Sequence, residues 1–271
     1  MKFDTMLEIS NLNVEVNGKM LLQDINITIP NSGWSSIIGP NGSGKTTLLR
    51  CILGVIPYTG TVQEAHLDQK SNLIIHAPNF SSPKSMKSVY RNLQRNVAYI
   101  AQKPVYPVGM TVAQYVSLAS LKNSKVNLKR ILEELEIYGL YDQSLATLSG
   151  GELQLVSIAR AIAQNPDLIL LDEPTSALDI HHQSRALALI SNLRDSGIPI
   201  ISVMHDLSAA AFYSDRLALL NQGRLLIYDQ PDLVINSPLL ANAFENAIDI
   251  LNLESGRSIV VGKETRGKKS K

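Results

Sequence analysis

The residues with the clearest capacity for chemistry form a glycine-rich segment, Gly39–Thr46, which reads Gly-Pro-Asn-Gly-Ser-Gly-Lys-Thr. This order fits G-x-x-x-x-G-K-[ST], in which glycines let consecutive backbone N–H groups curve around a phosphate and a following helix adds its positive dipole end. Lys45 would reach the β- and γ-phosphates, and the Thr46 hydroxyl would ligate Mg²⁺. A glycine-rich turn that binds nothing is disfavoured, because every position of the pattern is filled. The residues predicted to bind a nucleotide here are Gly39, Pro40, Asn41, Gly42, Ser43, Gly44, Lys45, Thr46 and Thr47.

A second group of chemically capable residues follows two apolar runs that are typical of buried strands. Asp172 and Glu173 follow the run Asp167–Leu171, and His205 follows Ile200–Met204. In open α/β sheets ligands bind at the carboxyl ends of the strands, so these side chains are predicted to share one crevice. Asp172 is then placed to bind Mg²⁺ directly or through water, and Glu173 is the candidate general base. Taken alone, an acidic pair in a polar turn and a helix-capping or core histidine remain open alternatives.

Ser149 and Glu152 have the spacing of a helix capping box, with Gly150 and Gly151 between them. The amino terminus of the helix that follows is a potential anion site. It lies far along the chain from Lys45, so an anion-binding role there requires a partner. A purely capping role is compatible with the functional one.

Gln102 follows the strand-like run Asn96–Ala101 and enters a loop. A lone glutamine after a strand is usually a polar loop residue, so its position alone favours no function. The histidines His66 and His76 have no cysteine at metal-ligand spacing, and we expect them to be surface or packing residues.

The elements that must position these residues alternate between strands and helices. Asn17-Gly18 separates two strand-like runs within Leu7–Pro30 and predicts a hairpin. Trp34–Ile38 is a strand that leads into the glycine-rich segment, and a helical pattern follows it. Further strands are predicted over Tyr58–Gln63, Leu73–Ile75, Arg216–Leu220 and Arg224–Tyr228, and helices over Thr111–Leu121, Leu128–Leu140, from Ser149 to the break at Asn165-Pro166, and over His181–Leu193, Ser208–Tyr213 and Pro231–Phe244.

Three segments have no clear periodicity. Ala65–Lys87 is expected to be a long surface loop, the stretch from Phe244 to Val261 is ambiguous, and Lys263–Lys271 is a basic tail. A solvated end is the expectation for this tail, with attraction to an anionic membrane surface as the alternative.

Composition sets limits on the class of protein. The 271 residues, 45% of them hydrophobic, suffice for one large domain or two modest ones. A net charge of +1 from 25 basic and 24 acidic residues argues against broad nucleic-acid binding. The single cysteine, Cys51, fits a reducing compartment. The chain has no signal-peptide pattern and no run approaching the ~20 apolar residues of a membrane helix, so any membrane link is expected to come through a partner.

Taken together, the motifs resemble those of an ABC transporter ATPase subunit, and the resemblance runs from about Leu7 to about Phe244. The Leu-Ser-Gly-Gly signature after a P-loop is what separates this family from other P-loop NTPases. The segments that carry the resemblance, in order, are Gly39–Thr46, Gln102, Leu148–Glu152, Leu168–Glu173, Ser176–Asp179 and His205.

The resemblance implies roles that the residues alone do not establish. Gln102 is similar to the Q-loop residue that touches the metal and the water, and His205 to the switch residue at the γ-phosphate. Ser149, Gly150, Gly151 and Glu152 resemble the signature that meets ATP held by the opposite subunit. Asp179 resembles the D-loop residue at the dimer seam. Two half-sites completed in trans imply a head-to-tail homodimer with ATP and Mg²⁺ sandwiched between subunits.

The resemblance also implies an architecture: an α/β P-loop NTPase core with a mostly parallel sheet, an N-terminal antiparallel β subdomain and an inserted α-helical subdomain over about residues 103–160. Residues 1–245 would form the ABC ATPase domain, and residues 246–271 a C-terminal extension. The implied partners are polytopic permease subunits and, indirectly, a substrate-binding protein, at the cytoplasmic face of the membrane. No nucleic-acid partner is expected.

Within the family, the chain is most similar to subunits that serve iron-siderophore, haem and vitamin B12 uptake. Glu152, Leu178–Gln183 and the segment after His205 carry this similarity, and zinc and manganese importers come next. A non-transport ABC protein, such as an assembly scaffold, is the alternative from another class. The chain departs from the family pattern at Val16, where an aromatic residue usually stacks on adenine, at Leu155, where an arginine is common, and in a longer interval between Lys45 and Gln102.

Overall fold

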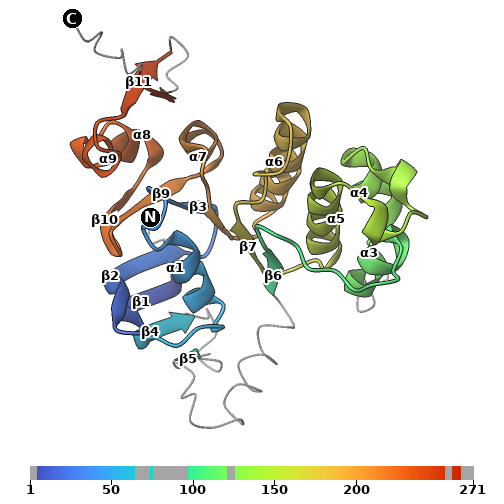
Figure 1. Cartoon of the computed structure of the whole chain (residues 1–271), viewed down its shortest axis with the longest axis horizontal. Coiled ribbons are helices and arrows are strands. Elements are labelled where there is room, and N and C mark those ends of the chain that lie inside the picture. The colour runs from blue at the N-terminus through green and yellow to red at the C-terminus, as the bar shows by residue number, and fades with distance from the viewer. Residues whose placement is uncertain (1–4, 65–73, 76–96, 121–125, 254–257, 264–271) are drawn as a thin grey trace, which may run out of the picture.

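The computed structural model describes residues 5–64, 74–75, 97–120, 126–253 and 258–263 (Figure 1). Most of the predicted loop Ala65–Lys87, both histidines within it and all but the first residue of the basic tail lie outside these residues. The short strand predicted there is present as β5 (Ile74–Ile75), which pairs with β4 (Thr59–Glu64).

The central sheet of the described chain has six strands in the order β10-β9-β3-β8-β7-β6. Five of these strands run parallel, and β10 closes one edge antiparallel to β9. The three inner strands β3, β8 and β7 are buried at every position, which is typical of parallel strands covered on both faces. The bounds are β3 (Trp34–Ile38), β6 (Val97–Ile100), β7 (Leu168–Asp172), β8 (Ile200–Val203), β9 (Arg216–Asn221) and β10 (Arg224–Asp229).

Alternate residues of the central strands face two different cores, because side chains along a strand point to opposite faces. Ile37 belongs to the core that includes helix α1 (Lys45–Ile52) and the N-terminal strands. Ile38 belongs to the core that includes α5 (Gly150–Ala163), α6 (Ile180–Asp195) and α7 (Leu207–Tyr213). The glycine-rich segment leaves the sheet between these two layers.

A second, antiparallel sheet forms from β1 (Thr5–Val16), β2 (Lys19–Pro30), β4 and β5. The Asn17-Gly18 hairpin is confirmed, and both residues have positive φ angles, 51° and 76°, as such a turn requires. The alternating burial of β2 explains why this sheet packs only one face on the core.

The helical region, which comprises α3 (Val112–Ser120), α4 (Leu128–Glu134) and α5, lies beyond the β6 edge of the sheet (Figure 1). The predicted helix Leu128–Leu140 is wrong in its second half. Glu136 adopts a left-handed φ of 58°, and the chain continues as a 3₁₀ turn over Tyr138–Leu140. In a continued helix Ile137 would point away from the buried face of Ile131, Leu132 and Leu135, whereas after the break it is buried, at 2% exposure.

The C-terminal part of the described chain forms α8 (Pro231–Ile235), α9 (Pro238–Ala243) and a hairpin of β11 (Ile248–Asn252) and β12 (Ser258–Gly262). The ambiguous segment is thus a hairpin, and it is fixed to α7: Val260 N donates to Ser208 Oγ at 3.0 Å, and Ser208 Oγ faces Val260 O at 3.3 Å. The division of the chain after residue 245 stays a prediction. Within the described residues, none of the helices has the length and apolar character needed to cross a membrane.

Candidate functional site

The glycine-rich segment connects β3 to α1 at the carboxyl edge of the parallel sheet. Gly39 has a φ of 143°, and a Cβ there would lie 2.0 Å from the carbonyl oxygen of Leu220, so only glycine fits. Gly44 immediately precedes the helix with a φ of 103°. A glycine-rich loop of this shape directly before a helix amino terminus is suited to binding an anion.

Lys45 is the buried cation of this loop, with only 7% of its surface exposed. Its ammonium donates hydrogen bonds to the carbonyl oxygens of Gly39 at 2.8 Å and Pro40 at 2.9 Å. Burial lowers the pKa of the Lys45 ammonium, while the charges of Glu173 and Asp172 oppose that shift. The cation is thus held at the mouth of the loop, facing two carboxylates.

The hydroxyl of Ser43 provides an independent test of whether a phosphate fits. Its oxygen is buried and has no hydrogen-bond partner among the described residues. A buried hydroxyl without a partner costs free energy, so native structures usually satisfy it. A phosphate oxygen cradled by the loop would supply the missing partner.

Thr46 and Asp172 meet although they lie 126 residues apart in the chain. The Thr46 hydroxyl donates to Asp172 Oδ1 at 2.8 Å, and Asp172 is 1% exposed at the end of β7. Hard oxygen ligands of this kind suit Mg²⁺, which usually takes one or two carboxylates and completes its shell with phosphate oxygens and water. The two residues therefore fit the metal role predicted for them. Sequence analysis missed Tyr99, whose hydroxyl lies 3.4 Å from Asp172 Oδ2, because only the pairing of β6 with β7 brings it there.

Glu173 stands one residue beyond Asp172 in a left-handed conformation, with a φ of 49°. Its Oε2 accepts a hydrogen bond from Gln102 Nε2 at 2.6 Å. Strained backbone of this kind is a feature of functional sites, where surrounding structure holds it in place. The structure thus places Gln102 in contact with the candidate base, a contact that its position in the sequence alone did not predict.

His205 follows β8 and lines the same small cavity as Glu173. The cavity has a volume of about 200 Å³, and its walls are formed by Glu173, Thr175, Ser176, Leu178, Gln183, Met204, His205 and Asp206. Its position after the carboxyl end of β8 agrees with the crevice predicted from the strand pattern.

The signature residues form a separate group, in which Ser149 and Gly150 are exposed and Gly151 and Glu152 are partly buried. Ser149 caps α5 in a complete capping box: its N–H donates to Glu152 Oε2 at 2.7 Å, and Glu152 N–H donates to Ser149 Oγ at 3.3 Å. Hydrogen bonds from Ser149 lower the pKa of the Glu152 carboxyl. Neither Ser149 nor Gly150 is among the residues that line the cavity at Glu173. Among the described residues, the walls of this cavity therefore include neither of these two signature residues.

Asp179 caps α6 and accepts a hydrogen bond from His182 N at 2.8 Å, which is the largest cause of its lowered pKa. Gly151 lies against the same segment, since a Cβ there would be 3.1 Å from the carbonyl oxygen of Ala177. The signature and the segment Ser176–Asp179 are thus neighbours within the chain.

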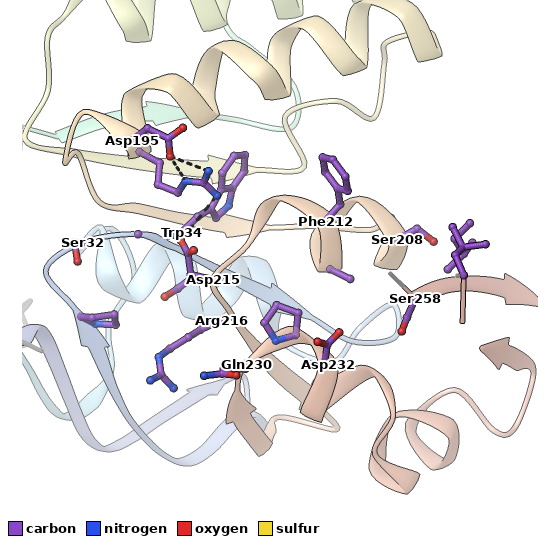
Figure 2. Close-up of a pocket in the computed structure, with 18 residues that line it drawn as sticks. Ser32, Trp34, Asp195, Ser208, Phe212, Asp215, Arg216, Gln230, Asp232 and Ser258 are labelled. Atoms are coloured by element: carbon purple, nitrogen blue, oxygen red, sulfur yellow. Dashed lines mark hydrogen bonds and ion pairs between the residues drawn. The ribbon is translucent and has the colours of Figure 1, made fainter. Parts of the chain in front are cut away.

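A larger cavity of about 970 Å³ lies at the opposite, amino-terminal edge of the sheet (Figure 2). Trp34 and Arg216, the first residues of β3 and β9, line it together with Phe212 of α7. None of the predicted nucleotide-binding residues contributes to it. Size alone does not make it the nucleotide site, because the phosphate-binding loop lies at the other end of β3.

Comparison with known proteins identifies the family. The family model described as ABC transporter matches residues 22–176, which span the P-loop, the signature and the acidic pair. The chain belongs to the ABC transporter family. This confirms the resemblance that the motifs carried.

Curated relatives of this ABC protein are named as importer components. The Fe(3+) ions import ATP-binding protein of Haemophilus influenzae (strain 86-028NP) is 36% identical over 241 residues, covering 86% of this chain and 65% of its own length. The hemin import ATP-binding protein of Chelativorans sp. (strain BNC1) is 30% identical over 263 residues, covering 93% and 95%. The cobalamin import ATP-binding protein of Halobacterium salinarum (strain ATCC 29341 / DSM 671 / R1) is 30% identical over 254 residues, covering 90% and 60%. The chain therefore spans about two thirds or less of the iron and cobalamin relatives, and nearly all of the hemin relative.

Solved structures confirm the fold class. An ATP-binding subunit of an ABC transporter superposes with a TM-score of 0.73 at 23% identity, covering 89% of this chain and 99% of its own. An ATP-binding cassette of an ABC transporter in its ADP conformation gives a TM-score of 0.69 at 24% identity, covering 89% and 98%. At this identity the likeness shows the fold alone, with its mixed central sheet, antiparallel N-terminal sheet and helices.

Proposed function

We propose that this chain binds ATP with Mg²⁺ and hydrolyses it to power a membrane importer. The observation that carries the proposal is the meeting of Thr46 with Asp172 beside the buried Lys45, which joins a phosphate loop to a metal-binding carboxylate. Membership of the ABC family and the names of the importer relatives support the same function.

The residues at the P-loop take distinct roles in this proposal. The N–H groups of Gly39–Thr47, all but Pro40, and the Lys45 ammonium would bind the phosphates, while Thr46, Asp172 and Gln102 would hold the metal. Mg²⁺ would supply charge neutralisation for the phosphates. Glu173 accepts the proton of the attacking water, and its bond to Gln102 orients the carboxylate. His205 closes the cavity beside Glu173, where the γ-phosphate would end.

The signature completes the site of a second copy. Ser149, Gly150, Gly151 and Glu152 form a helix amino terminus whose first two residues are exposed, and the segment that ends at Asp179 lies beside it. An anion site directed outward fits ATP held by another subunit, which makes the functional unit a head-to-tail homodimer. A dimer of this kind would dock on permease subunits at the cytoplasmic face of the membrane, with a substrate-binding protein as an indirect partner.

The cargo class proposed is a metal chelate: iron-siderophore, haem or cobalamin. The names of the relatives support it, although a spermidine/putrescine import protein of Fusobacterium nucleatum is also 36% identical over 241 residues. Cargo selectivity would reside in the permease and the binding protein.

Co-purification tests the transport function. The tagged chain, expressed from its own host and extracted in mild detergent, is expected to bring down a polytopic membrane protein in a nucleotide-sensitive complex. Recovery of a soluble multiprotein assembly instead would support a scaffold and reject transport.

A further inference from the structure

Glu136 lies where the helical region meets α6. Its left-handed backbone, with a φ of 58°, ends the run of α4 and turns the side chain out between the buried residues Leu135 and Ile137. Residues other than glycine adopt this conformation at a cost, so the surrounding contacts must hold it.

Two donors from α6 converge on the Glu136 carboxylate. His181 Nε2 lies 2.8 Å from Oε2, and Arg185 Nη1 contacts Oε1. These donors are one turn apart and therefore lie on one face of the helix. Arg185 Nε also reaches the carbonyl oxygen of Glu134 at 3.3 Å, at the carboxyl end of α4, where a cation is favoured. We call Glu136, His181 and Arg185 the Glu136 cluster.

The carboxylate of Glu136 is the charged centre of this cluster. The hydrogen bond from His181 is the largest cause of the lowered pKa of the Glu136 carboxyl; burial opposes it, and the charge of Arg185 adds to the lowering. It is therefore ionised at neutral pH and accepts on both oxygens. Two bonds from one carboxylate, to separate donors, restrict direction more than a single exposed ion pair does.

The start of α6 also borders the signature. Asp179 caps the helix two residues before His181, and Gly151 packs on the carbonyl of Ala177 just upstream. The helical region thus contacts this part of the core at two places, at Gly151 and at the Glu136 cluster. Together with the packing of α5 in the core, this pair of contacts links Ser149, on the helical region, to Asp179 at the start of α6.

We propose that Glu136 is a positioning residue that, through His181 and Arg185, fixes the orientation of the signature relative to Asp179. This consequence rests on the proposed function, which assigns both to the ATP of a partner subunit. Exposed ion pairs contribute little to stability, so the contribution here is to geometry. A displacement of about 1 Å in a catalytic arrangement can cost up to a hundredfold in rate, which makes the orientation matter.

The geometric part is tested without nucleotide. Spin labels at Asp142→Cys on the helical region and Ala188→Cys on α6 report the distance between the two parts, and buried Cys51 serves as an unlabelled background. Glu136→Gln is expected to broaden the distance distribution. Glu133→Gln is the matched control, because it removes the same charge from the same helical region but breaks only the internal pair with Lys129. An unchanged distribution in Glu136→Gln overturns the proposal, whether or not the chain hydrolyses ATP.

The functional part is read from the kinetics of the same variants. Glu136→Gln is expected to lower kcat for ATP about tenfold with KM unchanged, since the P-loop side is untouched. Glu133→Gln is expected to match the unmodified chain. Equal kcat in the two variants, despite a broadened distribution, rejects the positioning role. Absence of hydrolysis in the unmodified chain would instead refute the proposed function, and the distance measurement would still decide the geometry.

Discussion

Two phosphate-directed regions of this molecule are built in opposite ways. In the P-loop region the charged side chains are buried: Lys45 is 7% and Asp172 is 1% exposed. The hydrogen bond of the Thr46 hydroxyl goes to Asp172, 126 residues along the chain. The signature region begins at the surface, and its hydrogen bonds are local: Ser149 and Glu152, three residues apart, bond to each other in a capping box. The first is preorganised by the fold, whereas the second is a capped helix amino terminus at the surface. This contrast is what the proposed division of the nucleotide site between two copies requires.

The largest effect on hydrolysis is expected when the proposed general base, Glu173, is replaced. Glu173→Gln removes the proton acceptor but keeps the shape and the Gln102 contact, so kcat is expected to fall at least about a hundredfold while ATP binding persists and a dimer accumulates. Steady-state hydrolysis and size-exclusion chromatography with ATP measure both. Glu8→Gln, on an exposed position of β1, is the control; hydrolysis at the same rate in both variants would remove Glu173 as the base.

The two regions differ in the space available for a side chain at their glycines. Gly39→Ala places a Cβ 2.0 Å from the Leu220 carbonyl at a φ of 143°, and is expected to lower the free energy of unfolding by about 3 kcal/mol. Gly150→Ala meets nothing within 4 Å and is expected to leave stability unchanged or slightly higher. Urea denaturation compares them. Equal midpoints would mean that the P-loop is less constrained than its contacts imply.

The two roles of Ser149 are separable. Ser149→Ala removes the cap and is expected to cost about 1 kcal/mol of stability. Ser149→Asp keeps a capping oxygen but brings a negative charge toward the partner's phosphate. Turnover is therefore expected to fall in both variants, with stability lost only in Ser149→Ala. A fully active Ser149→Asp protein would assign Ser149 to capping alone.

Acid is expected to lower the stability of the signature region. The pKa values of the Glu152 and Asp179 carboxyls are below their ordinary values. A depressed folded-state pKa stabilises the protein above the unfolded pKa of about 4, and this contribution is lost as pH falls through the folded value. NMR titration of the side-chain carboxyls measures both. Ser149→Ala is expected to move the Glu152 pKa upward; an unmoved value would contradict the assigned cause.

Adenine recognition is expected to give the smallest effect. Val16, 44% exposed at the end of β1, replaces the stacking aromatic residue, so GTP is expected to compete nearly as well as ATP. Val16→Tyr adds about 1 kcal/mol of stacking and should raise the preference for ATP roughly fivefold. Competition binding of the two nucleotides measures the ratio of the affinities for ATP and GTP. Strong ATP selectivity in the unmodified chain would mean that another side chain stacks on the base.

The sequence predicts this contrast only in part, and the residues show why. Patterns with their own local physics were informative: Asn17-Gly18 predicted the hairpin, Ser149 and Glu152 the capping box, and Trp34–Ile38 the strand before the loop. Contacts between strands could not be predicted from such patterns. Tyr99 meets Asp172 only because β6 and β7 are neighbours in the sheet. The break at Glu136 was missed because helical periodicity continues through it while burial of Ile137 decides the backbone.

The central claim, that each nucleotide site is divided between two copies, is tested most directly by mixing two inactive variants. Lys45→Ala disables a P-loop. Gly150→Glu directs a carboxylate at the partner's phosphate, and its open surroundings leave the fold intact. Each alone is expected to be inactive, since every site in either homodimer is damaged.

A mixed dimer contains one site that is damaged twice and one that is intact. After co-expression in equal amounts, we expect ATP hydrolysis to recover to about a quarter of the unmodified rate, because half of the dimers are mixed and each carries one working site. Activity that stays at the level of the single variants would contradict the divided site and return the signature to its own chain.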